Sequence, residues 1–264
     1  VNGNWNYGPV TATRATELAI ERVKDRAMSI VTVRGCNHVA RLGRFVHMVA
    51  QHEHLIGLMC ANGHGADLAV APFGGRERRL PTNPLAVGIP TGRDWPIVLD
   101  MTTSMTSGGA LREYRNRNEP VPDGSIVDGH GRQTTDVEDY YNEPFGAMLP
   151  LGFPLVGHKG TGLAVVIDIL SGALSGAGCS QADPPESGNA LFLAILDIRA
   201  FRELTDFHDE VDRFIDFLKS SEPMEGFSEV MLPGEKSHRI RLEREAHGMD
   251  VDDTAWSQIS ELAG

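Results

Sequence analysis

The chain has 264 residues, with 24 Lys plus Arg against 36 Asp plus Glu and a formal net charge of −12. A protein that binds DNA or RNA through phosphate contacts is expected to contain a net basic domain, so we expect no nucleic-acid partner. The apolar run from Leu163 to Leu170 is interrupted by Asp168 and is far shorter than the roughly 20 residues of a membrane-spanning helix. Three scattered cysteines without a Cys-x-x-Cys motif are typical of a reducing compartment, and we expect a cytoplasmic protein.

Hydrophobic periodicity predicts helices that alternate with short strands. In chain order, the expected elements are a helix over residues 12–28 with Thr11 as its N-cap, a strand over 29–33, a helix over 42–54, strands over 55–60, 85–89 and 97–100, a core-facing helix over 161–174, a strand over 191–196, a helix over 201–219, a strand-like segment over 229–232 and a helical tail over 252–262. Residues 102–154, rich in Gly, Pro, Asn and Asp, are expected to form long functional loops. The pattern predicts an α/β or α+β fold, and the scarcity of long apolar strands argues against a doubly wound parallel sheet.

A histidine and an arginine follow the strand predicted over 29–33, in the segment Asn37-His38-Val-Ala-Arg41. A histidine can give or take a proton near neutral pH, and an arginine can hold a carboxylate through two parallel hydrogen bonds. The pair therefore suits the reduction of a 2-oxo acid. The spacing fits equally well with the alternative, in which a capping asparagine lies beside a surface histidine and a solvated arginine.

Two glycine-rich segments have the composition of cofactor-binding turns. The first runs from Gly152 to Gly160 and lacks the Gly-Lys-Ser/Thr ending of a P-loop, but its glycines, Lys159 and the following helix N-terminus suit a pyrophosphate. The second runs from Asp100 to Gly109 and places hydroxyl groups at the end of a strand, where they can line a ribose. A plain turn is the alternative for both segments. For the segment from Gly152 to Gly160, a nucleotide triphosphatase is a further alternative. No Gly-x-Gly-x-x-Gly fingerprint follows a strand, so a nicotinamide cofactor would bind outside the Rossmann pattern.

Two charged clusters are given less weight. His52-Glu53-His54 places its histidines on different sides of one helix, so we expect a solvated helix end and no metal site. Arg76, Arg78 and Arg79 either reach a cofactor phosphate or form a solvated basic loop.

Eight short motifs share one order and separation with a known family. They are Asn37-His38-x-x-Arg41-Leu-Gly43, Ala71-Pro-Phe-Gly-Gly75, Thr82-Asn83-Pro84, Val98-Leu-Asp100-Met-x-Thr-Ser104, Asp128-Gly-x-Gly131 with Thr134-Thr-Asp136, His158-Lys159-Gly160-x-Gly162-Leu, Asp168-Ile-Leu-Ser-Gly172 and Leu232-Pro-Gly-Glu235. In this order they resemble the malate/L-lactate dehydrogenase family that is unrelated to the Rossmann-type lactate dehydrogenases. Its members interconvert 2-oxo and 2-hydroxy acids with NAD or NADP. Their substrates include malate, lactate, sulfolactate, ureidoglycolate, 2,3-dioxogulonate and a cyclic imino acid, and the run from Ser104 to Leu111 looks most like the dioxogulonate reductase branch.

The resemblance implies an α/β fold with a mixed, largely antiparallel sheet, flanking helices and a non-Rossmann NAD(P) site. It makes residues 1–264 most of one such unit, with a cofactor-binding part at roughly 60–200 and a helical, substrate-binding part at 1–59 and 201–264. The family is usually homodimeric, with active sites at or near the subunit interface. We therefore expect a small-molecule 2-oxo or 2-hydroxy acid substrate and a homodimer.

The resemblance also implies roles for particular residues. His38 is the expected acid or base at the substrate carbonyl, and Arg41 and Thr82 are expected near the substrate. Asn62 is expected close to the nicotinamide. The remaining expected cofactor-binding residues are Asp100, Met101, Thr102, Thr103, Ser104, Met105, Thr106, His158, Lys159, Gly160, Gly234 and Glu235.

Two departures from the family pattern leave an alternative open. Ala40 stands where the family usually has glycine, which matters if the backbone there needs a positive φ. The given sequence also begins after the family's Ser-His-Gly-x-x-Arg segment, whose histidine is a second candidate for the proton donor. The alternative is a catalytically impaired or truncated relative that acts as a binding or interaction protein.

Overall fold

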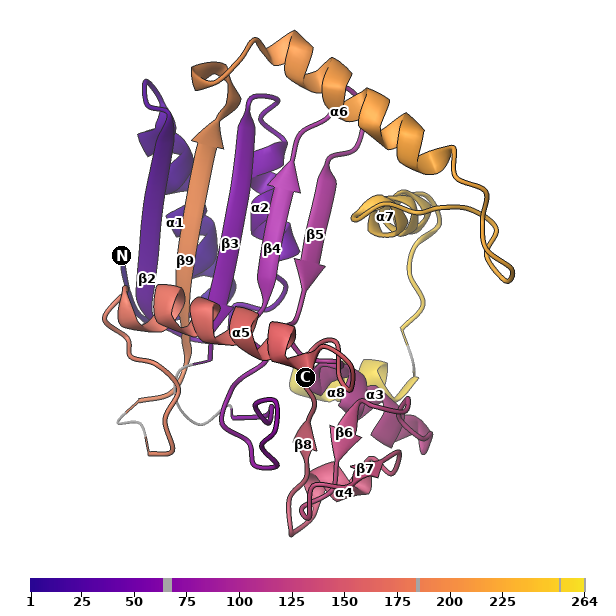
Figure 1. The fold of residues 1–264 in the computed structure, drawn as a ribbon. Coiled ribbons are helices and arrows are strands. Elements are labelled where there is room, and N and C mark those ends of the chain that lie inside the picture. The colour runs from indigo at the N-terminus through magenta and orange to yellow at the C-terminus, as the bar shows by residue number, and fades with distance from the viewer. Residues whose placement is uncertain (64–67, 184–185, 252, 264) are drawn as a thin grey trace.

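The computed structural model describes every residue except 64–67, 184–185, 252 and 264. Its main sheet has six strands in the order β1-β2-β9-β3-β4-β5, and only β1 and β2 pair in parallel (Figure 1). These strands are β1 (Asn2–Asn6), β2 (Met28–Cys36), β3 (Leu55–Asn62), β4 (Leu85–Ile89), β5 (Ile97–Met101) and β9 (Asn189–Asp197). The expected α/β fold with a mixed, largely antiparallel sheet is therefore confirmed.

Two helices, α1 (Gly8–Val23) and α2 (Gly43–Ala50), cover one face of this sheet (Figure 1). Side chains alternate across each strand, so every second residue packs against these helices. One cross-strand row of the covered face contains Val31, Leu193 and Met59, and all three are buried in the main core with Phe45 of α2. The opposite face of the sheet is not covered in this way.

A second, three-stranded antiparallel sheet lies below the first, where the sequence predicted only loops (Figure 1). The elements of this region are α3 (Gly108–Arg117), β6 (Ile126–Val127), β7 (Gln133–Thr134), α4 (Glu138–Tyr141) and β8 (Ala147–Met148). Leu111, Ile126 and Met148 lie in a small core of their own. The prediction of long loops over 102–154 missed these elements, because strands of two residues are too short to show periodicity and the ten-residue helix α3 buries only Leu111.

The long helix α5 (Gly157–Asp168) crosses the lower edge of the main sheet and continues as one π-helical turn, Ile169–Ala173 (Figure 1). The helix predicted over 161–174 exists, but only part of its apolar face meets the core. Ile167 is buried, whereas Val166 and Leu174 are 52% and 60% exposed. A helix that is apolar on two sides cannot be assigned an inner face from spacing alone.

The C-terminal third adds a 3₁₀ turn (Ile198–Ala200) and three helices, α6 (Leu204–Lys219), α7 (Glu235–His247) and α8 (Asp253–Ala263). The sequence predicted α6 and α8 but not α7, and the first residue of the predicted tail, Asp252, lies outside the described residues. Residues 229–232, predicted to be strand-like, form no strand. Among the described residues, no helix is both long enough and apolar enough to span a membrane.

The first predicted helix is displaced toward the N-terminus. It begins at Gly8 rather than at residue 12, with Pro9 in its first turn, and ends at Val23 because Met28 already belongs to β2. Thr11 is therefore inside the helix and is not its N-cap. Proline is well tolerated in a first helical turn, since the N–H that it lacks has no partner there.

Candidate active site

One edge of the main sheet gathers most of the residues singled out in the sequence. Strands β2 and β3 are both antiparallel to β9, and β4 is antiparallel to both β3 and β5, so β2, β3 and β5 end at the same edge. His38 follows β2, Asn62 ends β3, and Asp100 lies at the end of β5. Asn83 and Asn189 lie at the starts of β4 and β9, at this same edge. Topology thus brings together side chains that are far apart in the sequence.

Asn189 joins the His38 loop to the end of β3. Its Oδ1 accepts a hydrogen bond from the Val39 amide at 2.9 Å, and its Nδ2 donates to the Asn62 carbonyl oxygen at 3.2 Å. Asn189 is buried, so these bonds are shielded from water. The residue therefore fixes the chain directly after His38 relative to Asn62, while the His38 side chain itself stays exposed.

Asp168, at the C-terminal end of α5, is the centre of a buried polar cluster below the same edge. Asp168 is 4% exposed, and its carboxylate accepts hydrogen bonds from Asn62 Nδ2 at 3.2 Å and from Asn83 Nδ2 at 2.9 Å. The backbone amide and the hydroxyl of Ser180 donate to the same carboxylate. Four donors thus surround one buried carboxylate, and this arrangement fixes the ends of β3 and β4 against α5.

Two amide oxygens in this cluster fit a polar ligand. Asn62 Oδ1 and Asn83 Oδ1 are buried and accept no hydrogen bond from any described residue. A buried acceptor without a donor costs free energy, so such atoms are rare unless a ligand or water satisfies them. A carboxamide N–H₂, the polar group of a nicotinamide, is a donor of the type that these oxygens require.

Arg41 and Asp100 form an ion pair at the start of α2. Arg41 Nε lies 3.1 Å from Asp100 Oδ2, which also accepts a hydrogen bond from the Gly43 amide at 3.0 Å. Arg41 donates to Asp100 through Nε, and its two Nη groups form no hydrogen bond with any described residue. An arginine oriented in this way presents a planar fork of the kind that binds a carboxylate or phosphate.

The hydroxyl-rich segment after β5 packs against the Thr82 turn and the start of α5. Thr103 donates to the Thr82 carbonyl oxygen through both its amide and its hydroxyl, each at 2.9 Å, and its own carbonyl oxygen accepts from the Leu151 amide at 3.0 Å. Most of the segment is at least half-buried, and Met105 is 37% exposed. Within the segment, Thr102 Oγ1 donates to the Ser104 carbonyl oxygen and Ser104 Oγ to that of Thr106, while Met101 is the last residue of β5.

His158, Lys159 and Gly160 form the first turn of α5. The rings of His158 and Phe73 meet edge to face, and Lys159 is exposed. Gly160 is buried against the backbone of Leu151, where a Cβ would collide with the carbonyl oxygen. Leu151, on which Gly160 packs, also donates its amide to the Thr103 carbonyl oxygen, so this turn is linked to the Thr103 segment through Leu151.

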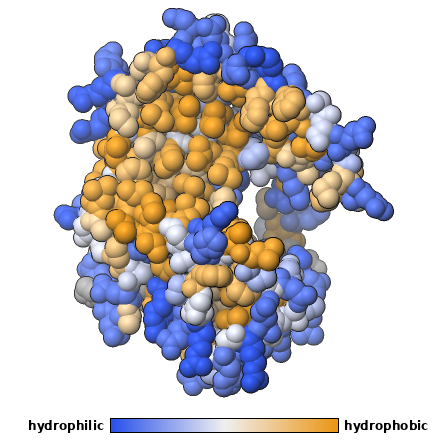
Figure 2. Space-filling model, in the orientation of Figure 1, coloured by the Kyte–Doolittle hydropathy of each residue, from blue (hydrophilic) through white to orange (hydrophobic). Residues whose placement is uncertain are grey.

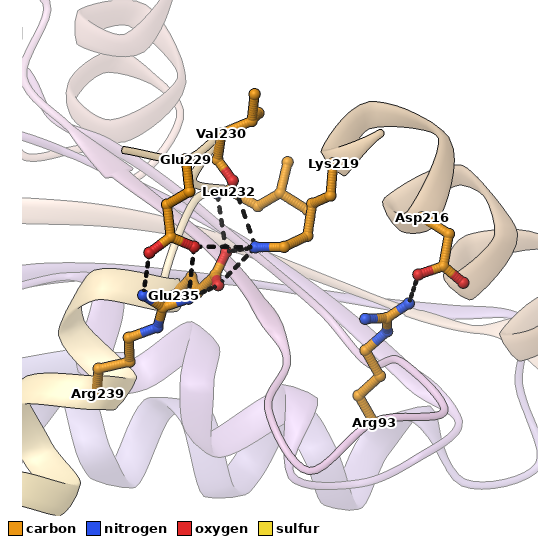
Figure 3. Close-up of polar contacts among 8 residues, drawn as sticks. All are labelled: Arg93, Asp216, Lys219, Glu229, Val230, Leu232, Glu235 and Arg239. Carbon is orange, nitrogen blue, oxygen red and sulfur yellow. Dashed lines mark hydrogen bonds and ion pairs between the residues drawn. The ribbon is translucent and has the colours of Figure 1, made fainter. Parts of the chain in front are cut away.

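The Gly234-Glu235 turn lies beside β5, where Val98 N donates to the Pro233 carbonyl oxygen at 3.0 Å. Gly234 has φ 91°, a conformation that strains any residue with a Cβ. Glu235 is 4% exposed, and its carboxylate accepts hydrogen bonds from Lys219 Nζ at 2.7 and 2.8 Å and also pairs with Arg239 (Figure 3). Burial raises the pKa of Glu235, but the hydrogen bonds from Lys219 and the Leu232 amide, together with the charges of Lys219 and Arg239, lower that pKa below its ordinary value. The side chain predicted to contact a cofactor is thus engaged in holding α6 to α7.

Sequence reasoning selected the loops of this site but missed the residues that connect them. Asn189 was not considered, while Asn83 and Asp168 appeared only inside motifs. Apart from Ser180, which lies 12 residues from Asp168, the partners of their side chains lie 81 to 150 residues away, so local patterns give no sign of these contacts. Among the described residues, no group of three or more His, Cys, Asp or Glu side chains is arranged to hold a metal.

Ala40, between His38 and Arg41, occupies the left-handed region with φ 61°. This conformation costs an L-residue with a Cβ roughly 1 kcal/mol, which explains why glycine suits the position. We expect Ala40→Gly to raise the free energy of unfolding by up to about 1 kcal/mol. Part of this gain is offset because glycine increases the conformational entropy of the unfolded chain. Urea unfolding checks this, with Ala200→Gly in the 3₁₀ turn as a control that should destabilise. A loss of stability in Ala40→Gly as large as in the control would contradict the strain argument.

Comparison with known proteins supports the same chemistry. A family model described as malate/L-lactate dehydrogenase matches residues 1–260. The chain is 36% identical to a malate dehydrogenase of Pyrococcus horikoshii, covering 100% of this chain and 73% of that protein, and 34% identical to an L-lactate dehydrogenase of Cupriavidus necator, covering 99% and 74%. The crystal structure of malate dehydrogenase from Entamoeba histolytica superimposes with a TM-score of 0.90 at 26% identity, covering 99% of this chain and 75% of that one.

The fold and these matches define an oxidoreductase of hydroxy acids that works with a nicotinamide cofactor. The chain belongs to the malate/L-lactate dehydrogenase family. None of these matches favours the binding-protein alternative or a nucleotide triphosphatase.

Proposed function

We propose that this chain transfers a hydride between NAD(P)H and a 2-oxo acid, with the 2-hydroxy acid as the product of reduction. The candidate substrates are malate, lactate and sugar-derived 2,3-dioxo acids such as 2,3-diketogulonate. The proposal is carried by one observation, the convergence of His38, Arg41, Asn62 and Asp100 at a single sheet edge. The named relatives, which include malate, lactate and sulfolactate dehydrogenases, support the substrate class.

Each side chain has a separate task in this proposal. His38 is exposed and donates a proton to the carbonyl oxygen during reduction, then accepts one in the reverse direction. Arg41 binds the substrate carboxylate through its Nη edge, since its Nε is held by Asp100. Thr82 lies beside the substrate on the turn that Thr103 fixes. Placement and charge are thus the contribution of the protein to the rate.

Residues 60–200 are proposed to hold most of the cofactor, and 1–59 with 201–264 the substrate. The nicotinamide supplies or accepts the hydride when it is bound. Asn62 and Asn83 would receive its carboxamide through their unpaired oxygens. The segment from Asp100 to Thr106, the first turn of α5 with Lys159, and the Gly234 turn would line the rest of the cofactor.

The test is turnover with a panel of 2-oxo acids and both reduced cofactors, followed as loss of absorbance by the nicotinamide. Oxidation with at least one acid is expected, and the panel identifies the substrate. Calorimetry with NAD, NADP, NADH and NADPH is the independent readout. Absence of both turnover and binding of every cofactor would refute the proposal and leave the binding-protein alternative.

The uncovered face of the main sheet supports a homodimer. Figure 2 shows a broad apolar surface over β2, β9, β3 and β4 that continues onto α5. Ile30 of β2 is 52% exposed, and across the sheet it continues into Ala194, Leu58 and Val87, each half-buried. Monomeric proteins rarely expose contiguous apolar patches of more than a few hundred Å². We propose that a second copy of this chain covers this face.

A charge placed in that face is expected to separate the subunits. Ile30→Asp buries an unpaired carboxylate in the dimer but not in the monomer, so the dissociation constant should rise at least ~100-fold. Light scattering after gel filtration should change from about twice 28.7 kDa to about 28.7 kDa. The control is Met224→Asp, because Met224 is 77% exposed after α6, outside the apolar face. A monomeric wild-type protein would contradict the proposal.

A cytoplasmic location is also proposed. Cys36, Cys60 and Cys179 are all free thiols, and the first two are buried. Burial raises the pKa of both buried thiols, which keeps them protonated and unreactive at neutral pH. Free thiols of this kind are typical of a reducing compartment.

A further inference from the structure

Asn189, the first residue of β9, lies at the sheet edge that carries the candidate active site. Strand β9 lies between β2 and β3 (Figure 1). Its backbone pairing with β3 ends at Ala190 and Asn62, and β2 ends at Cys36, opposite Asn189. Past these pairs, the Asn189 side chain connects β9 both to the end of β3 and to the loop that follows β2.

The Asn189 carboxamide binds on both sides as a backbone peptide group would. Its Oδ1 accepts a hydrogen bond from the Val39 amide at 2.9 Å, and its Nδ2 donates to the Asn62 carbonyl oxygen at 3.2 Å. These partners determine which end of the amide is oxygen, because an N–H requires an acceptor and a carbonyl oxygen requires a donor. Asn189 is 8% exposed, so both bonds are shielded from water. One buried side chain thus links the residue after His38 to the residue proposed to receive the nicotinamide.

The other contacts of the His38 loop, residues 37–41, hold it against β1 and the start of α1. Asn37 Nδ2 donates to the carbonyl oxygens of Trp5 and Asn6, at 2.6 and 3.3 Å. Gly8 packs so closely on the loop that a Cβ at this position would lie 2.0 Å from the His38 carbonyl oxygen. Since β1 pairs with β2 on the side away from β9, these contacts do not reach the end of β3. The loop is therefore tied to the cofactor side of the sheet through β9.

Asn62 is fixed independently of Asn189. Its backbone belongs to the ladder between β3 and β9, and its Nδ2 donates to Asp168 Oδ1 and to the Gly178 carbonyl oxygen, each at 3.2 Å. Removal of the Asn189 side chain would therefore leave Asn62 in place and release the residue that follows His38. Of the two groups that Asn189 joins, the His38 loop is the one whose position depends on it.

We propose that Asn189 is a positioning residue, which holds His38 in register with Asn62 so that the proton and the hydride reach the same carbonyl group. This inference rests on the proposed function. During reduction the carbonyl carbon gains the hydride of the nicotinamide as a new C–H bond, the π electrons of the C=O bond move to oxygen, and the oxygen binds the proton that His38 gives up. The cofactor is left oxidised and His38 neutral. Carbonyl carbon and oxygen are only about 1.2 Å apart, and a misplacement of about 1 Å can cost about 100-fold in rate. The proton donor therefore has to be fixed relative to the nicotinamide site, and Asn189 is the side chain that fixes it.

Substitution of Asn189, alone and together with His38, provides the test by steady-state kinetics and calorimetry. Asn189→Ala should lower kcat at least about tenfold, because the His38 loop can then shift. The KM for the 2-oxo acid and the affinity for NADPH should change by less than about threefold, since Arg41 stays paired with Asp100. In the His38→Ala background the same substitution should lower kcat by less than about twofold, because the group through which Asn189 acts is absent. A merely structural role would reduce kcat by the same factor in both backgrounds.

A second variant separates the two hydrogen bonds of Asn189. Asn189→Asp keeps the volume and the acceptor for the Val39 amide but turns an oxygen toward the Asn62 carbonyl oxygen, so it should lower kcat nearly as much. The matched control is Ser29→Ala, at the other end of β2, because Ser29 is 7% exposed and donates its hydroxyl to the Ala19 carbonyl oxygen at 2.7 Å. The control loses a buried hydrogen bond, so its melting temperature should fall while kcat stays unchanged.

The outcomes separate this inference from the proposed function. Wild-type kcat in Asn189→Ala or in Asn189→Asp, or an equal loss in both backgrounds, would overturn the inference while hydride transfer to a 2-oxo acid stands. Wild-type kcat in His38→Ala would also overturn it, because the loop would then carry no proton donor. If Asn189→Ala does not fold, Asn189→Asp alone and combined with His38→Ala decides by the same criterion. Absence of both turnover and cofactor binding in the wild-type protein would overturn the proposed function as well.

Discussion

The variant His38→Ala should lose nearly all turnover while binding the cofactor almost normally. General acid–base catalysis by a positioned side chain contributes typically 10²–10⁴-fold, so kcat should fall by at least about 100-fold. The effect on folding should be small because His38 is exposed and its side chain forms no hydrogen bond with any described residue. Steady-state kinetics gives kcat, and calorimetric titration with NADPH gives the cofactor affinity.

Two comparisons make the His38 experiment decisive. His130→Ala removes another exposed histidine, in the turn between β6 and β7, and should leave kcat unchanged. A small amine or imidazole added to His38→Ala should restore part of the activity if the lost group is a proton donor. If His38→Ala keeps wild-type kcat with every active 2-oxo acid, the proton must come from another residue.

The strands of the main sheet were predictable because local signals mark them. Strand β4, Leu85–Ile89, lies between Pro84 and Pro90 and matches its predicted range. In contrast, β1 has the sequence Asn-Gly-Asn-Trp-Asn, which has little strand propensity, and it forms because β2 offers an open edge to pair with. This strand forms through tertiary pairing, so no local sequence pattern predicts it.

The missed helices share a different cause. Among the described residues of α3 and α7, only Leu111 and Glu235, respectively, are buried, so neither helix has the apolar stripe on which periodicity depends. Helix α3 is instead defined by its ends, where Ser107 caps the N-terminus and Asn118 adopts the left-handed conformation at the C-terminus. The ion pairs of Glu235 with Lys219 and Arg239 take the place of apolar packing for α7 (Figure 3).

The residues of the candidate site also fall into two groups, those that local sequence patterns indicate and those that only tertiary pairing brings into place. His38, Arg41 and Asp100 were identifiable because their chemistry and local spacing are visible in the chain. The contacts of Asn189 with Val39 and Asn62 depend on the pairing of β9 with both β2 and β3, which no local pattern specifies. The residues proposed to act could therefore be selected from the sequence, while those that position them were visible only in the fold.

Asp168→Ala should cause the largest loss of stability of any single substitution considered. Asp168 is 4% exposed, and its carboxylate accepts four hydrogen bonds, from Asn62, Asn83 and the amide and hydroxyl of Ser180. Removal of the acceptor leaves these donors without a partner in a buried setting, which costs on the order of 3–5 kcal/mol. For a chain of this size the melting temperature should fall by roughly 6–15 °C.

Thermal and urea unfolding measure this loss, and a graded series separates hydrogen bonding from cavity formation. Asp168→Asn keeps the volume but turns an amide N–H₂ toward the surrounding donors, so it should lose a large part of the same stability. Ser180→Ala removes only one donor and should cost about 1 kcal/mol. Asp209→Ala, at an exposed position of α6, should change the free energy of unfolding by less than about 0.5 kcal/mol. A loss in Asp168→Ala no larger than in Asp209→Ala would mean that the cluster does not hold β3 and β4 against α5.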